Sequence, residues 1–245
     1  MKGMILAAGV GSRLRPLTDR VPKALVEVGG VPMIERVIGR LASAGVTALV
    51  VNLFHLGDRI VEFVASRRDF GLRIQFIHEV ALLDTGGGLK NAARFFDDGR
   101  PFFLHNVDVV SEIDLGALLR FHEQARPLAT LAVQSRPSSR QLLFDRSGRL
   151  VGRETSGGVE WARGPVAPVE RLGFAGIHVV DPAIFPRMNE TGAFPITRTY
   201  LRLAGEGEHI VAYRADGQYW QDIGSAEKLE HARRYLSRRR LQVPD

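Results

Sequence analysis

The sequence contains no cysteine among its 245 residues. It therefore has no disulfide framework, no zinc site built on thiolates and no cysteine nucleophile, and a reducing compartment is the simplest location. Any metal must bind to oxygen or imidazole ligands. The chain also lacks the long apolar run of a membrane-spanning helix, and its amino terminus lacks the apolar core and cleavage pattern of a signal peptide. We expect no membrane span and a cytoplasmic location.

Acidic residues are relatively scarce, with 27 aspartates and glutamates against 33 lysines and arginines and a formal net charge of +6. A basic surface can bind phosphate chains, but aromatic residues are not interleaved with the arginines as a base-stacking platform requires. We therefore expect no nucleic-acid partner. The alternative, a nucleic-acid-binding module, would bind tightly and with a steep salt dependence. Much of the basic excess lies near the carboxyl end, in Arg233, Arg234, Arg238, Arg239 and Arg240.

Apolar segments follow two alternating patterns. Short, partly β-branched runs such as ALVVNLF and PFFLHNV are typical of buried strands, whereas PMIERVIGRLASAG and DLGALLRFHEQA have the apolar spacing of helices. This alternation predicts a Rossmann-like three-layer α/β/α fold with a mostly parallel mixed central sheet, in which binding sites gather at the carboxyl ends of the strands. After about Leu128 the strands follow one another through turns, which predicts a small β subregion in the second half.

The chain contains no internal repeat and no convincing linker, so we expect a single domain over residues 1–245, without room for a second one. The stretch from Thr155 to Val169 is rich in glycine and proline and predicts a flexible excursion. A last helix is expected from about Ala226 to Arg240.

The most specific segment is LAAGVGSRLRPLT, which follows the first predicted strand. That strand is expected to end near Ala8, and Gly9 and Gly11 allow a tight turn whose N–H groups can approach a phosphate. Two common nucleotide motifs do not fit, because the third glycine of the dinucleotide fingerprint and the Gly-Lys pair of the P-loop are both missing. Instead, Arg13 can donate two hydrogen bonds to a phosphate, and Lys23 offers a compact charge.

These residues carry a family resemblance. LAAGVGSRLRPLT and PKAL resemble the signature of the sugar-1-phosphate nucleotidylyltransferases, which is Leu-Ala-Ala-Gly-x-Gly-x-Arg-Leu-x-Pro-Leu-Thr after a strand, followed by Pro-Lys. The similarity continues through DTGGGLKNAARFF, FFLHNVDVVSEIDL, GFAGIHVVDPAIF and YWQDIGSAEKLEHA and so covers nearly the whole length. Among the branches of the family, the chain is most similar to the short, single-domain kind that includes N-acetylmuramate-1-phosphate uridylyltransferase.

The resemblance implies roles for particular residues. Lys23 matches the lysine that neutralises charge at the reacting phosphate, and Arg13 matches the arginine that holds the far end of the triphosphate. Both are therefore candidate catalytic residues. The glycines after Thr85 are expected to let the nucleotide approach the backbone before a helix begins. The full set expected to bind the nucleotide is Ala7, Ala8, Gly9, Gly11, Ser12, Arg13, Lys23, Thr85, Gly86 and Gly87.

Two carboxylates are expected to bind a metal ion. Asp108 follows the apolar strand PFFLHNV, and Asp222 in YWQDIGS matches the second acidic position of the family. Together with phosphate oxygens they make a hard, oxygen-rich site, for which Mg²⁺ is the expected cofactor. Asn106 and Gly176 are expected to face the sugar. Asp114, in contrast, is predicted to cap the helix that it precedes.

The implied reaction joins a nucleoside triphosphate, UTP or GTP, to a sugar 1-phosphate and releases an NDP-sugar and pyrophosphate, as in nucleotide-sugar biosynthesis for a cell wall. It is a direct in-line displacement that requires no protein nucleophile. Residues 1–127 would form the nucleotide-binding half, and residues 128–245 the sugar-binding half and the carboxyl-terminal helix. The protein is expected to be a monomer or a small homo-oligomer.

One position departs from the family pattern. Many relatives carry Asn-Gly-Asp where this chain has Asn106-Val107-Asp108, and valine does not adopt a positive φ without strain. Either the backbone is ordinary there and the sugar differs, which we favour, or the chain is a catalytically silent sugar-nucleotide sensor. A cytidylyltransferase for a small phosphorylated alcohol, which shares the amino-terminal loop, is a third reading. The family's Glu-Lys-Pro motif has no clear counterpart around Glu154, which leaves the sugar contacts open.

Overall fold

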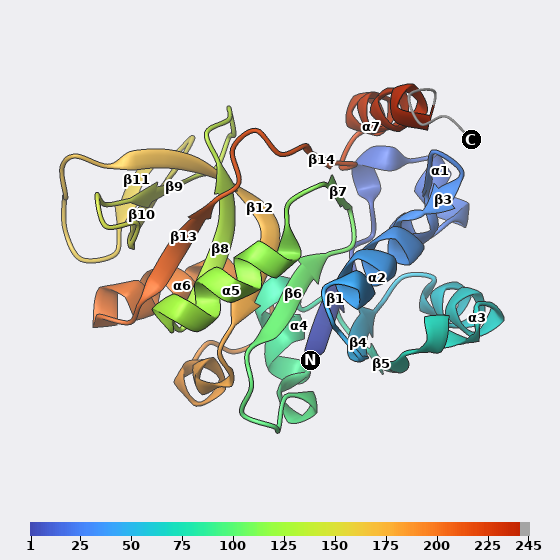
Figure 1. The fold of residues 1–245 in the computed structure, drawn as a ribbon, viewed down its shortest axis with the longest axis horizontal. Helices are drawn as coiled ribbons and strands as arrows, with labels where there is room; N and C mark the ends of the chain where they lie inside the picture. The colour runs from blue at the N-terminus through green and yellow to red at the C-terminus, as the bar shows by residue number, and fades with distance from the viewer. Residues whose placement is uncertain (241–245) are drawn as a thin grey trace.

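A computed structural model describes residues 1–240, and residues 241–245 of the predicted domain lie outside the described residues. Strands and helices alternate through the first half of the chain (Figure 1). The α-helices are α1 (Leu17–Arg20), α2 (Met33–Ser43), α3 (Gly57–Ser66), α4 (Asp84–Asn91), α5 (Leu115–Ala125), α6 (Ile196–Glu206) and α7 (Ala226–Arg240). The 3₁₀ helices are η1 (Ser12–Leu14), η2 (Lys23–Leu25), η3 (Arg68–Gly71), η4 (Ala93–Phe95) and η5 (Pro182–Arg187).

The strands form one large mixed sheet and two small ribbons. Their bounds are β1 (Lys2–Leu6), β2 (Glu27–Val28), β3 (Val31–Pro32), β4 (Ala48–Leu53), β5 (Arg73–His78), β6 (Phe102–Asn106), β7 (Val109–Ser111), β8 (Ala129–Gln134), β9 (Gln141–Phe144), β10 (Leu150–Thr155), β11 (Gly158–Trp161), β12 (Glu170–Val180), β13 (Ile210–Arg214) and β14 (Trp220–Asp222). The main sheet has the order β11-β10-β9-β12-β6-β1-β4-β5, and β8 joins it between β12 and β13. The small ribbons are β2–β3 and β7–β14.

The first half of the sheet is parallel, and the second half is mainly antiparallel. Strands β6, β1, β4 and β5 run parallel, joined by helical crossovers. Strand β12 then pairs antiparallel with β6, β8 and β9, so one sheet continues from the first half of the chain into the second. The predicted mixed α/β sheet and the β subregion are both confirmed.

Side chains alternate across the sheet and create a core on each face, as a buried strand requires. In β1, Met4 and Leu6 pack in one apolar cluster with Leu89 of α4 and Tyr200 of α6, whereas Ile5 packs in the other with residues of α2, α3 and α5. Figure 1 shows α2 and α5 in front of the sheet and α4 and α6 behind it. The predicted three layers are thus present.

Two predictions about strands were wrong. The first strand ends at Leu6 rather than near Ala8, which leaves a longer polar loop before η1. The glycine- and proline-rich stretch after Thr155 contains β11, which pairs with β10 as an antiparallel hairpin. Backbone pairing with an edge strand organises this stretch, and turn residues in the sequence do not report such pairing.

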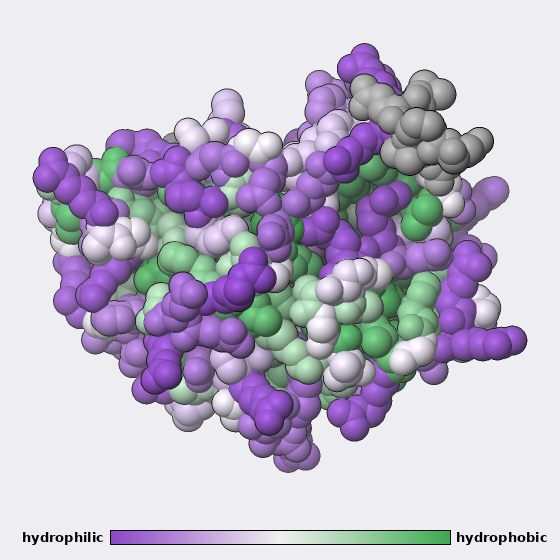
Figure 2. All heavy atoms as spheres, in the orientation of Figure 1, coloured by the Kyte–Doolittle hydropathy of each residue, from purple (hydrophilic) through white to green (hydrophobic). Residues whose placement is uncertain are grey.

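The starts of helices α5 and α7 were predicted correctly. Asp114 accepts a hydrogen bond from the backbone N–H of Ala117 at 2.8 Å and caps α5, as expected. Helix α7 begins at Ala226 and packs through Leu229 and Ala232 on an apolar cluster that includes Ile223. Among residues 1–240, no helix combines the length and the apolar content needed to cross a membrane. In Figure 2, hydrophilic atoms dominate the outline of the molecule and apolar atoms show mainly in the middle of this face, as amphipathic helices over a sheet predict.

Candidate functional site

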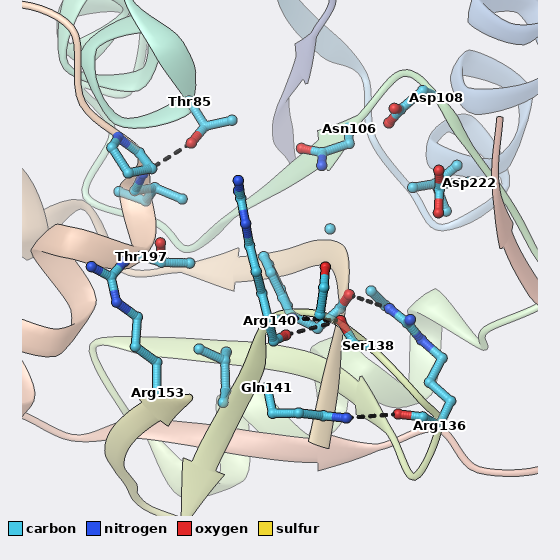
Figure 3. A pocket seen from close by; sticks show the side chains of 18 of the residues that line it. Thr85, Asn106, Asp108, Arg136, Ser138, Arg140, Gln141, Arg153, Thr197 and Asp222 are labelled. Atoms are coloured by element: carbon cyan, nitrogen blue, oxygen red, sulfur yellow. Dashed lines mark hydrogen bonds between the residues drawn. The ribbon is translucent and has the colours of Figure 1, made fainter. Parts of the chain in front are cut away.

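A cavity of about 1270 Å³ lies where the two halves of the chain meet. Figure 3 shows Asn106, Asp108 and Asp222 along one part of its wall, with Thr85 and Arg140 across from the two carboxylates. Both predicted metal ligands and both predicted sugar-facing residues therefore share one space. The predicted site residues that line this cavity are Arg13, Thr85, Asn106, Asp108, Gly176 and Asp222.

The glycine-rich loop after β1 is held in a tight turn. Gly11 has a φ of +69°, and a Cβ there would lie 2.9 Å from Cγ2 of Thr18, so the position requires glycine. Its carbonyl accepts a hydrogen bond from Oγ1 of Thr18 at 2.8 Å. Gly9 is exposed and has no neighbour near its missing side chain, and Ser12 and Arg13 are exposed in η1. The loop thus offers open backbone and an exposed cation beside the cavity.

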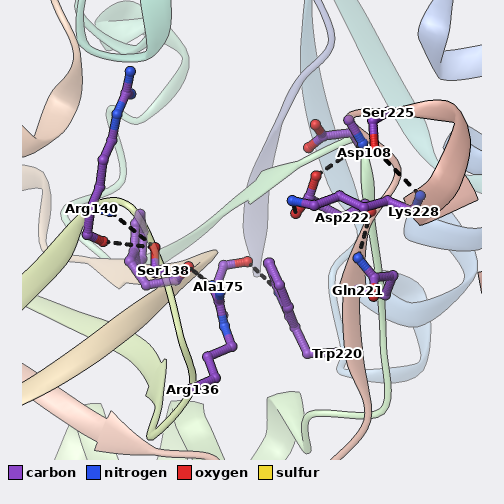
Figure 4. A network of polar contacts seen from close by, with 12 residues as sticks. Asp108, Arg136, Ser138, Arg140, Ala175, Trp220, Gln221, Asp222, Ser225 and Lys228 are labelled. Carbon is purple, nitrogen blue, oxygen red and sulfur yellow. Dashed lines mark hydrogen bonds and ion pairs between the residues drawn. The ribbon is translucent and has the colours of Figure 1, made fainter. Parts of the chain in front are cut away.

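The two predicted metal carboxylates are brought together by the β7–β14 ribbon. Asp108 lies in the turn before β7, and Asp222 ends β14, where it stands opposite Val109. The backbone N–H of Ile223 donates to the Asp108 carbonyl at 2.9 Å. Nζ of Lys23 pairs with Oδ2 of Asp108. Nζ of Lys228 lies 2.5 Å from Oδ2 of Asp222 (Figure 4).

This donor set fits a hard divalent cation that also binds substrate. Within the described part of the chain, no group of three or more histidine, aspartate or glutamate side chains could hold a metal ion by itself. Asp108 and Asp222, which line one cavity, provide two carboxylates, and phosphate oxygens would have to complete the shell. A magnesium ion bound together with a nucleotide meets that requirement.

The predicted sugar-facing residues lie side by side at the ends of β6 and β12. Gly176 has a φ of +71° and sits where the β12–β8 register shifts between Phe174 and His178. A Cβ on Gly176 would lie 2.6 Å from Nδ2 of Asn106. Only glycine at position 176 in β12 therefore leaves room for the Asn106 side chain at the end of β6. Beside them, Nε1 of Trp220 donates to the carbonyl of Ala175 at 2.8 Å.

Val107 takes an ordinary backbone conformation. It is buried in the core, its N–H donates to the carbonyl of Leu6 at 3.1 Å, and it is not among the residues with positive φ. The valine therefore fits without the strain that a glycine-like φ would impose, and Asp108 still reaches the cavity.

Comparison with known families agrees with this geometry. Residues 2–142, more than half of the chain, match the model of the nucleotidyl transferase family. The chain belongs to the nucleotidyl transferase family. The matched region contains the glycine-rich loop, Lys23 and Asp108, whereas Asp222 lies beyond it.

Similar proteins with a named activity include mannose-1-phosphate guanyltransferases. That of Yarrowia lipolytica is 32% identical over 228 residues, which span 91% of this chain and 61% of the fungal protein. The mannose-1-phosphate guanylyltransferase catalytic subunit beta of Danio rerio is 30% identical and aligns with 100% of this chain and 67% of its own length. The transferase chain thus spans about three fifths of the length of the fungal relatives. These relatives do not test the predicted N-acetylmuramate branch.

Solved structures with the same fold cover almost all of the transferase. A putative glucose-1-phosphate thymidylyltransferase from Bacillus anthracis superposes with a TM-score of 0.80 at 22% identity and covers 96% of this chain and 94% of its own. HddC from Yersinia pseudotuberculosis, complexed with GMP-PN, has a TM-score of 0.74 at 22% identity over 96% of this chain and 99% of its own. At these identities the likeness concerns the fold alone.

Sequence reasoning missed a buried network beneath the glycine-rich loop of the transferase. Oδ1 of Asn52 accepts from the N–H of Ala7 at 2.9 Å, and Nδ2 of Asn52 donates to Oε1 of Glu79 at 2.8 Å. Oε2 of Glu79 accepts from the N–H of Leu83 at 3.0 Å. The network ties the ends of β1, β4 and β5 to the start of α4, and it occupies the N–H of Ala7 that was expected to approach the nucleotide. The sequence signal that could have predicted this network is the polar pair Asn52 and Glu79 at the ends of the strand-like segments that form β4 and β5.

The predicted position of the glycines after Thr85 needs correction, because these residues lie inside α4 rather than before a helix. The N–H groups of Gly86 and Gly87 both donate to the carbonyl of Phe194, at 2.9 and 3.3 Å, and are buried. Oγ1 of Thr85 accepts from the N–H of Ile196 at 2.9 Å. These contacts fix α4 against the start of α6, so close helix packing accounts for the glycines.

Replacement of Gly86 by alanine is expected to destabilise the transferase. A Cβ there would lie 2.3 Å from Cε2 of Phe194 and 2.9 Å from its carbonyl oxygen, so the helices must move apart. We expect the free energy of unfolding, measured by urea denaturation, to fall by about 1–3 kcal/mol. Gly39, an exposed glycine of α2 with no neighbour within 4 Å, is the matched control. Gly39→Ala should raise the same free energy by up to about 1 kcal/mol, and unchanged stability of Gly86→Ala would contradict this account.

Two buried histidines each pair with a hydroxyl group. His178 lines the cavity, and its Nδ1 pairs with the hydroxyl of Tyr200 at 2.8 Å, while Nδ1 of His122 pairs with Oγ1 of Thr130 at 2.9 Å. Burial lowers the pKa of His178 to about 3 and that of His122 to about 4. Both rings are therefore neutral near pH 7, and His178 acts as a polar wall rather than as a cation.

These histidines predict an acid-sensitive fold. A buried histidine whose pKa lies below its unfolded value of about 6.5 binds fewer protons when folded, so protonation favours the unfolded chain as the pH falls below that value. We expect the urea midpoint to drop from pH 7 to pH 5. His122→Asn, which removes one titrating ring, should reduce the drop, whereas His209→Asn at an exposed site should not. A urea midpoint that does not change between pH 7 and pH 5 would contradict the prediction that protonation of buried histidines destabilises the fold.

Proposed function

We propose that this nucleotidyl transferase joins a nucleoside triphosphate to a sugar 1-phosphate and releases an NDP-sugar and pyrophosphate. The observation that carries the proposal is the lining of the cavity, which combines Arg13 of the glycine-rich loop, the Asp108 and Asp222 pair, and the wall formed by Asn106 and Gly176. A triphosphate on the loop and a sugar phosphate against the wall would meet beside the two carboxylates. Both substrates then have a recognisable place in one space.

The chemistry needs positioning and charge rather than a protein nucleophile. An oxygen of the sugar's phosphate forms a bond to the α-phosphorus of the triphosphate. The bond from that phosphorus to the oxygen leading to the β-phosphate breaks, and pyrophosphate leaves with the electron pair. Lys23, which reaches Asp108, would offset the negative charge that develops on the α-phosphate, and Arg13 would hold the departing pyrophosphate by two hydrogen bonds.

We assign Asp108 and Asp222 to a magnesium site. Both are hard oxygen donors that line one cavity, Asp108 from the turn before β7 and Asp222 from the end of β14, which suits an ion whose remaining ligands are phosphate oxygens and water. When bound, such an ion supplies positive charge to the phosphate oxygens during the displacement.

The similar proteins suggest which substrates to test first. Several carry the name mannose-1-phosphate guanyltransferase, so GTP with mannose 1-phosphate is the leading pair. The chain spans 61% of the length of the Yarrowia lipolytica protein. UTP with N-acetylmuramate 1-phosphate is the second pair, from the sequence resemblance. A reaction that consumes nucleoside triphosphates also supports the cytoplasmic location expected from the sequence.

The test is pyrophosphate release by the purified chain. GTP, UTP, CTP, ATP and dTTP are each paired with mannose, glucose and N-acetylmuramate 1-phosphate, with Mg²⁺ and with EDTA in parallel. We expect release from one preferred pair that requires both substrates and is lost with EDTA. No release from any pair, with a triphosphate still bound by calorimetry, would overturn the proposal in favour of a silent sensor. Nothing in the site favours the sensor, because Val107 is unstrained and Lys23 and Asp108 are in contact.

A further inference from the structure

Five cations line the cavity, and three of them are already engaged. Nη2 of Arg136 donates to the carbonyl of Phe174 at 2.7 Å, and the guanidinium carbon lies 3.7 Å from the centroid of the Trp220 ring. Arg153 pairs with Glu160 at 2.7 Å, and Lys228 pairs with Asp222 at 2.5 Å. The five cations are Arg13, Arg136, Arg140, Arg153 and Lys228.

Arg140 is the cavity-lining cation of the second half of the described chain that has no such partner. Within residues 1–240, its guanidinium has no ion pair, hydrogen bond or ring contact. Figure 3 shows its side chain rising from the β8–β9 loop into the cavity, toward Thr85 and Asn106. A planar cation with five N–H donors therefore points into the space where a ligand would lie.

The backbone beneath Arg140 is held in place. Its N–H donates to Oγ of Ser138 at 3.2 Å, and its carbonyl accepts from the same hydroxyl at 3.0 Å (Figure 4). Nε2 of Gln141 donates to the carbonyl of Arg136 at 3.0 Å and closes the loop. Gln141 begins β9, which pairs with β12 of the main sheet. A hydrogen-bonded backbone that carries a free guanidinium is an arrangement that suits a phosphate clamp.

The proposed reaction needs such a clamp. The sugar's phosphate carries up to two negative charges and must approach a triphosphate that carries still more, so it needs its own cation. The chain has lysines only at Lys2, Lys23, Lys90 and Lys228. Of these, Lys228 alone belongs to the second half, and it is held by Asp222. No lysine of the sugar-binding half is therefore free to hold the acceptor phosphate.

We infer that Arg140 binds the phosphate of the acceptor sugar 1-phosphate, the group that attacks the α-phosphorus, while Arg13 holds the pyrophosphate end of the donor. The inference rests on the proposed function, because it concerns the second substrate of the same site. It assigns one free arginine to each substrate: Arg13 from the loop after β1 and Arg140 from the loop before β9. Two hydrogen bonds from the Arg140 fork would fix the direction of attack.

Steady-state kinetics of Arg140→Gln test the assignment with the preferred substrate pair. We expect the KM for the sugar 1-phosphate to rise about 10- to 100-fold, the range for loss of a charged hydrogen bond. The KM for the triphosphate should change less than about twofold, since that substrate uses other cations. Arg140→Lys keeps the positive charge but loses the planar guanidinium. Its KM for the sugar 1-phosphate should lie between those of the wild type and Arg140→Gln. Arg146→Gln, an exposed arginine of the β9–β10 turn outside the cavity, should match the wild type.

The reverse reaction separates the two arginines. Arg140→Gln should raise the KM for the NDP-sugar and leave that for pyrophosphate unchanged, and Arg13→Gln should do the opposite. A purely structural role for Arg140 would raise both constants together or lower the urea midpoint. Equal KM values for the sugar 1-phosphate in Arg140→Gln and the wild type would overturn the inference while the proposed function stands.

Binding measured without turnover distinguishes failure of the Arg140 assignment from failure of the proposed function. Calorimetric titration of mannose 1-phosphate, glucose 1-phosphate and N-acetylmuramate 1-phosphate is compared for the wild type, Arg140→Gln and Arg146→Gln, with free mannose as a phosphate-free probe. Loss of sugar-phosphate binding only in Arg140→Gln supports the inference even if no pyrophosphate is ever released, which would overturn the proposed function alone. Absence of wild-type binding to all three phosphates, together with no turnover, would overturn both.

Discussion

Lys23→Ala is expected to lower turnover about 100- to 1000-fold while the protein stays folded, the range for loss of one preorganised donor at a developing charge. Lys23 begins η2, its side chain is 12% exposed, and its Nζ reaches Oδ2 of Asp108. It therefore lies where the triphosphate loop meets the proposed metal site. Its loss removes positive charge from the reacting phosphate, and only a small part of the core changes.

The measurement is kcat for pyrophosphate release, with the urea midpoint as the check on folding. Lys90→Ala is the matched control, because Lys90 is another partly buried lysine whose Nζ donates to the carbonyl of Glu190 at 2.6 Å, away from the cavity lining. That variant should lose some stability and keep its turnover. Lys23→Arg should recover part of the lost rate, and a fully active Lys23→Ala enzyme would remove Lys23 from the mechanism.

Asp108→Asn is expected to abolish magnesium-dependent activity, with a loss of more than about 1000-fold, because a metal ion supplies several kcal/mol of transition-state stabilisation. Asparagine keeps the shape of the side chain but removes the negative charge. It also leaves Lys23 without its carboxylate partner. Asp222→Asn should behave similarly, because its carboxylate lines the same cavity and belongs to the same proposed metal site.

Rates measured over a range of Mg²⁺ concentrations give the test. Asp114→Asn is the control, since Asp114 caps α5 outside the main cavity and asparagine is an equally good cap. It should keep the wild-type rate at every magnesium concentration. If Asp108→Asn did the same, Asp108 would not be a metal ligand.

Much of the architecture could be predicted from local patterns. Alternating apolar runs specified the strands that carry Met4 and Ile5 on opposite faces, and helical spacing specified α2 and α5. Such patterns succeed because burial of one face is a local property of the sequence. The hairpin of β10 and β11 was not predicted, because the pairing of an edge strand depends on its neighbour and not on its own residues.

The candidate site was also predicted only in part. Motif residues such as Arg13, Asp108 and Asp222 were predicted because the residue type alone gives the charge and binding chemistry of a side chain. The structure brings all three to one cavity. The buried pair of Asn52 and Glu79 was missed, because each is an ordinary polar residue until three strand ends meet around it.

By itself the sequence determined the layered α/β fold, the glycine-rich loop with its cations, and the pair of carboxylates, because periodicity and residue type report burial and chemistry locally. Only the tertiary structure decided that Gly86 serves helix packing and that Val107 is free of strain. It also decided that Arg140, unlike Arg136, keeps a free guanidinium in the cavity. These outcomes depend on which side chains from distant segments fill the surrounding space, and that is a property of packing rather than of any short stretch of sequence.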